Sequence, residues 1–88
     1  SDISQDYSRH TMIETRIPFL TVKRRIALKG ISLIYADDKL IGRIEGSRIF
    51  FFIDDKPEEF QALGTHMEAR RFLVENWEEI YDRIKDKL

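Results

Sequence analysis

The sequence has no cysteine, only two prolines and four glycines, and no long unbroken hydrophobic run. Without cysteine, the chain can form neither a disulfide framework nor a thiolate metal site. This absence fits a reducing compartment, and we expect a cytoplasmic protein. No apolar stretch approaches the roughly 18 residues that cross a bilayer, so we expect no membrane partner.

A large excess of charge of either sign is also missing, because the 88 residues carry a net charge of −1. The charges are nevertheless uneven: residues 1–53 hold nine basic and six acidic side chains, and residues 54–88 hold six and ten. A hydrophobic fraction of 42% and a charged fraction of 35% are typical of a soluble globular chain. We expect a flexible leader at residues 1–10 and a single domain at residues 11–88.

A run of large apolar residues at 49–53 is the strongest local signal in the chain. Its short length and its β-branched and aromatic content predict a β-strand. Side chains on a strand alternate between faces, so one face takes Ile49, Phe51 and Ile53 and the other takes Phe50 and Phe52. A strand that is apolar on both faces usually needs a cover on each of them.

Turn signals on the N-terminal side of this strand predict a β-meander. Asp37-Asp38 and Glu45-Gly46-Ser47 are typical turn sequences, and they separate apolar segments. We therefore expect antiparallel strands at about 23–35, 39–45 and 48–54. A less regular segment at 12–22 is the candidate for a further strand, although Pro18 suits only an edge strand or a break between strands.

The C-terminal third has helix signals. Asp55 followed by Pro57 predicts a capped short helix from Pro57 to about Leu63, ended by Gly64. The capping box that begins at Thr65 predicts a long helix to about Lys87. Its apolar stripe is Ala69, Leu73, Trp77, Ile80, Ile84 and Leu88. The expected fold is α+β: an antiparallel β-meander of three to five strands, then a short helix and a long C-terminal amphipathic helix packed on one face.

Catalytic and metal-binding patterns are missing from the sequence. The two histidines, His10 and His66, lie far apart and have no cluster of acidic residues at ligand spacing around them. The acidic pairs 37–38 and 54–55 are explained by turns and helix capping. No glycine-rich phosphate loop and no nucleophile motif is present. We therefore expect no enzymatic activity, no cofactor and no metal.

A basic run is the feature most suggestive of a ligand. The segment from Arg16 to Lys29 holds five basic residues and no acidic one, and two further arginines lie on neighbouring predicted strands. Such a patch can bind phosphate backbones by releasing counterions. The alternative is a solvated strand edge whose charges discourage edge-to-edge pairing. The candidate nucleic-acid-binding residues are Arg16, Lys23, Arg24, Arg25, Lys29, Arg43 and Arg48.

The second face of the central strand raises a separate question. The N-terminal segment could fold over it, the sheet could close into a barrel, or a second copy of the chain could dock there. We expect a homodimer whose interface includes Phe50 and Phe52, or Phe51 in the opposite orientation. The leading functional hypothesis is a small non-enzymatic protein–protein interaction module, and the alternative is a nucleic-acid-binding domain.

Overall fold

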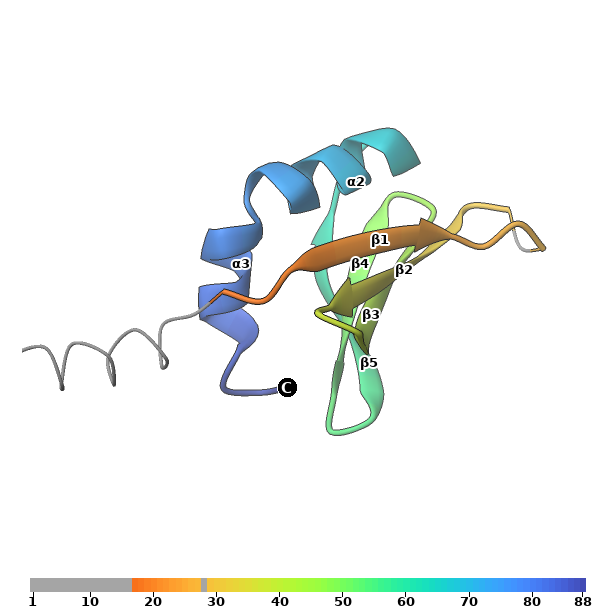
Figure 1. The fold of residues 1–88 in the computed structure, drawn as a ribbon. Helices are drawn as coiled ribbons and strands as arrows, with labels where there is room; N and C mark the ends of the chain where they lie inside the picture. The colour runs from red at the N-terminus through yellow and green to blue at the C-terminus, as the bar shows by residue number, and fades with distance from the viewer. Residues whose placement is uncertain (1–16, 28) are drawn as a thin grey trace, which may run out of the picture.

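The computed structural model describes residues 17–27 and 29–88 of the chain. Five strands form one antiparallel sheet in the order β1-β2-β3-β4-β5, and two helices follow (Figure 1). The predicted α+β class and antiparallel meander are confirmed. The elements are β1 (Leu20–Arg24), β2 (Ile31–Ala36), β3 (Lys39–Glu45), β4 (Arg48–Ile53), β5 (Lys56–Ala62), α2 (His66–Glu75) and α3 (Trp77–Ile84).

The fifth strand corrects the prediction of a short helix from Pro57 to Leu63. Asp54 and Asp55 have φ angles of 53° and 65°, and positive φ at both central residues is what a type I′ hairpin turn requires. The chain therefore reverses after β4 and pairs with it as β5. Pro57 is tolerated because β5 is an edge strand. The Asp-x-Pro pattern favours a helix locally, but the free edge of β4 has unpaired backbone N–H and C=O groups. Pairing with β5 satisfies these groups, so the strand forms and the helix does not.

The predicted long helix is in fact two short ones, α2 and α3, which meet at Asn76. The Asn76 side-chain amide donates to the carbonyl oxygen of Phe72 at 2.9 Å, and Asn76 has φ −117° and ψ 19°. Asparagine side chains compete with the helical hydrogen bonds in this way. The break turns α3 away from the direction of α2, as Figure 1 shows. The predicted start is confirmed, since Thr65 Oγ1 accepts from the Glu68 N–H at 3.1 Å.

Both helices lie against one face of the sheet, here called the inner face. On β4, Ile49 and Phe51 point inward and are 0% and 1% exposed, while Phe50 and Phe52 point to the opposite, outer face. The predicted alternation along this strand is confirmed. The buried apolar core consists of Ile34, Ala36, Ile41, Ile44, Ile49, Phe51, Ala69, Leu73, Trp77, Ile80 and Ile84.

The N-terminal strands differ from their predicted bounds. A single strand was expected at about 23–35, but β1 ends at Arg24 and β2 begins at Ile31, so two separate strands fall in this range. The predicted leader at 1–10 and most of the segment 12–22 before β1 lie outside the described residues. In the described part of the chain β1 and β5 are opposite edges of an open sheet, so no barrel closes over the outer face. Across residues 17–27 and 29–88, no helix is both long enough and apolar enough to cross a membrane.

Candidate interaction surface

A row of paired residues crosses the outer face of the sheet. Antiparallel pairing places Lys23 opposite Leu33, Leu33 opposite Arg43, Arg43 opposite Phe50, and Phe50 opposite Glu59. Side chains that face each other across neighbouring strands point to the same side of the sheet. The row therefore begins with a cation on the β1 edge, passes over apolar groups, and ends with a carboxylate on the β5 edge.

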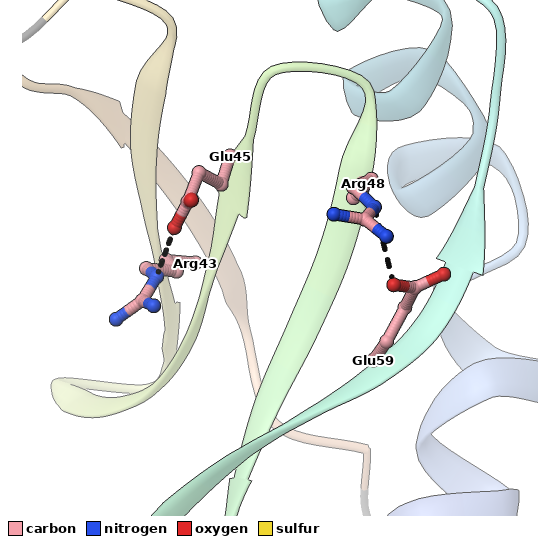
Figure 2. A network of polar contacts seen from close by, with 4 residues as sticks. All are labelled: Arg43, Glu45, Arg48 and Glu59. Atoms are coloured by element: carbon pink, nitrogen blue, oxygen red, sulfur yellow. Dashed lines mark hydrogen bonds and ion pairs between the residues drawn. The ribbon is translucent and has the colours of Figure 1, made fainter.

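Arg43 on β3 partly covers the two phenylalanines of the outer face. Its guanidinium carbon lies 5.6 Å from the ring centroid of Phe50 and 6.0 Å from that of Phe52. The same guanidinium donates from Nε to Glu45 Oε2 at 3.0 Å (Figure 2). Cation–π contacts of this kind stabilise by about 0.5–1 kcal/mol at exposed sites. Sequence reasoning missed this intrachain cover, because it depends on a cross-strand register that the sequence does not reveal.

A second ion pair joins β4 to β5 beside the first. Arg48 Nε lies 3.2 Å from Glu59 Oε1, and both side chains remain partly exposed (Figure 2). Exposed pairs such as this contribute at most about 1 kcal/mol to stability. Their effect on the surface is larger, because Arg43 and Arg48 each face a carboxylate. The centre of the outer face is therefore close to electrically neutral.

The structure describes six of the seven residues proposed for nucleic-acid binding, and these six have different surroundings. Arg43 and Arg48 are paired with carboxylates on the sheet, and Lys23 lies over the ring of Tyr35 with Nζ 5.2 Å from its centroid. Arg24, Arg25 and Lys29 are exposed at and beyond the end of β1, and Arg16 lies outside the described residues.

No helix or strand of the described chain lies over the apolar part of the outer face, which the Arg43 side chain covers only in part. Leu40 is 42% exposed, and the other members are half-buried among neighbouring side chains of the same sheet. These other members are Ile31, Leu33, Tyr35, Phe50 and Phe52. The two predicted interface residues, Phe50 and Phe52, are thus on an accessible face and partly solvated.

A groove of about 390 Å³ lies at one end of the sheet, where the β2–β3 and β4–β5 turns meet the C-terminal residues Lys87 and Leu88. Its other lining residues are Lys39, Leu40, Ile41, Phe52, Asp54 and Asp55. No group of three or more potential metal ligands occurs in the described ranges.

His66 is a structural residue at the start of α2. Its Nδ1 lies 2.7 Å from the carbonyl oxygen of Gly46, and its Nε2 lies 2.8 Å from the hydroxyl of Ser32, which is 0% exposed. Because a carbonyl oxygen only accepts, Nδ1 carries the hydrogen and Nε2 accepts from Ser32. The imidazole thereby ties the first turn of α2 to β2 and to the β3–β4 turn.

We expect His66→Phe to lower the free energy of unfolding by about 1–3 kcal/mol, because it leaves the buried Ser32 hydroxyl without a partner. Adding Ser32→Ala to that variant should restore part of the loss, since the unpaired hydroxyl is then gone. Urea unfolding of the wild type, both single variants and the double variant measures this coupling. Strictly additive effects would contradict the role assigned to the imidazole.

Comparison of the chain with protein-family models, with curated proteins and with solved structures gives no match.

Proposed function

We propose that the domain is a protein–protein interaction module that forms a homodimer through the outer face of its sheet. The observation that carries this proposal is an uncovered apolar face with opposite charges at its two edges. Lys23 stands on the β1 edge, and Glu59 stands on the β5 edge of the same cross-strand row. A face of this kind is complementary to a second copy of itself.

The symmetry of the dimer follows from where the charges lie. A two-fold axis parallel to the strands, between two facing sheets, places the β1 edge of one copy over the β5 edge of the other. Lys23 of each copy then faces Glu59 of its partner, whose carboxylate would take Lys23 as a second cation beside Arg48. The two β3 strands lie opposite each other near the axis. Sheets that pack face to face are about 10 Å apart with strands nearly aligned, which brings such long side chains within reach of each other.

The apolar centre supplies the attraction in this arrangement. Leu33, Tyr35, Phe50 and Phe52 are half-buried in one copy and would be removed from water by the other. Burial of apolar surface contributes about 25 cal/mol for each Å². The neutralised arginines, Arg43 and Arg48, favour a protein partner over a polyanion on this face, because each already faces a carboxylate.

The dimer is tested with two charge-reversal variants, which are measured first separately and then as a mixture. Lys23→Glu replaces both attractive contacts of the dimer by repulsive ones, and Glu59→Lys does the same, so each variant alone should dimerise roughly tenfold or more weakly. In a mixture of the two, one molecule of each kind restores an opposite-charge pair at both contacts. Sedimentation should therefore show dimers in the mixture at concentrations where each variant alone sediments as the 10.5 kDa monomer.

Glu58→Lys is the matched control, because it makes the same charge change on the same strand. Glu58 pairs with the inward-facing Phe51, so it lies on the other side of β5. This variant should dimerise like the wild type. A wild-type protein that sediments only as a monomer at micromolar concentration would reject the proposal, and so would a mixture that remains monomeric.

A further inference from the structure

The residues between β1 and β2 that the structure describes, 25–27 and 29–30, lie beyond the end of the sheet (Figure 1). The base of this connection is held by backbone hydrogen bonds. The Arg25 N–H donates to the Ile31 carbonyl oxygen at 2.9 Å, and the Gly46 N–H of the β3–β4 turn donates to the Gly30 carbonyl oxygen at 2.8 Å. These bonds hold the two ends of the connection close to the sheet.

The connection combines an aliphatic side chain with cations. Ile26 is 98% exposed, more than any other large hydrophobic residue in the described chain. Arg24, Arg25 and Lys29 are exposed close to it in the sequence, and none of them has an ion-pair partner within residues 17–27 and 29–88. No acidic residue occurs in the sequence between Arg16 and Ala36, so the cations are not neutralised locally.

The chemistry of the loop points to one class of anionic partner. Stacking on bases requires aromatic side chains, and reading base edges uses amides or arginines placed in a groove together with polar companions. The described loop residues offer no aromatic, amide or hydroxyl side chain. Cations beside an exposed aliphatic residue suit the interface of an anionic membrane, where lipid headgroups take the charges and the acyl boundary takes the apolar side chain.

We infer that this segment docks the domain on an anionic lipid surface, with Ile26 entering the headgroup region and Arg24, Arg25 and Lys29 contacting lipid phosphates and carboxylates. Such a contact needs no membrane-spanning segment, and it would replace the expectation from the sequence that the protein has no membrane partner. It does not depend on the proposed homodimer, because the loop lies at the end of the sheet and not on its outer face.

The test is co-sedimentation with vesicles of phosphatidylcholine alone or with added phosphatidylserine. The wild type should pellet with the anionic vesicles only, and less at high salt. Each cation near such a surface strengthens binding about fivefold, so Arg24→Ala with Arg25→Ala should weaken it roughly 30-fold. Ile26→Ser should weaken it roughly tenfold. A tryptophan at this position, Ile26→Trp, should shift its emission to shorter wavelength on anionic vesicles.

Lys39→Ala with Lys56→Ala is the control, because it removes two positive charges at the opposite end of the sheet. This variant should bind like the wild type, and an equal loss would overturn the inference in favour of overall charge. Absence of pelleting at low salt would also overturn it. So would retention by duplex DNA that is lost in the arginine variant but unchanged in Ile26→Ser, since the partner would then be a nucleic acid.

Discussion

Trp77→Ala is expected to lower the free energy of unfolding by about 3–5 kcal/mol. Trp77 opens α3, is 7% exposed, and packs among the core residues under the sheet. Its ring also lies 5.4 Å from that of Tyr81. The substitution removes the largest side chain of the core and leaves a cavity that the short helix cannot fill by moving. Thermal or urea unfolding measures the loss.

A second variant separates the contribution of the indole hydrogen bond from that of the apolar volume of Trp77. Trp77 Nε1 donates to the Pro18 carbonyl oxygen at 2.9 Å, and this bond is buried. Trp77→Phe keeps most of the apolar volume but leaves that carbonyl without a donor, so we expect an intermediate loss of about 1–3 kcal/mol. An unchanged melting temperature in Trp77→Ala would show that the residue is not part of the core.

Gly42→Ala is expected to be nearly as damaging, at about 3 kcal/mol or more. A Cβ atom on Gly42 would overlap the carbonyl oxygen of Phe50 on the neighbouring strand and press on the backbone of Phe51. Neither obstacle is the flexible end of a side chain, so β3 and β4 would have to separate. Pairing shifts register close to this point, since Ile34 faces Gly42 and Tyr35 faces Leu40.

Gly46→Ala separates this steric effect from backbone strain. Gly46 has φ +64°, but no atom lies within 4 Å of a Cβ placed there. Its cost is limited to the left-handed conformation, about 1 kcal/mol for alanine. Urea unfolding should therefore give Gly42→Ala a much lower free energy of unfolding than Gly46→Ala. The reverse order would contradict the close approach of the two strands.

The sheet was predictable where sequence signals are local and agree with one another. The apolar run at 49–53 and the turn residues on its N-terminal side identify β3 and β4, and the capping box identifies Thr65. The β5 strand was not predictable by these rules, because Asp55 and Pro57 fit a helix start as well as a hairpin. The hairpin forms because β4 has unpaired backbone groups on its free edge. Whether that edge is free depends on how the strands assemble, which local sequence signals do not show.

The break at Asn76 has a similar explanation. The spacing of Leu73, Trp77 and Ile80 continues without interruption, so the apolar pattern predicts one helix. The interruption comes from the Asn76 side chain, which bonds to a backbone carbonyl inside the preceding turn. The shared facing of Phe50 and Phe52 was predictable from the alternation along the strand, whereas the carboxylate partners of Arg43 and Arg48 depend on the details of the folded sheet.

The order of the strands has a consequence for how fast the chain reaches this structure. Every strand pairs with its neighbour in sequence, and three of the four connections are two residues long. Closing such short loops costs little entropy, so the sheet can grow by successive hairpins. The hydrogen bond between Pro18 and Trp77 spans 59 residues, so it can form only when α3 reaches the chain just before β1. We therefore expect the fluorescence of this indole to report the docking of α3.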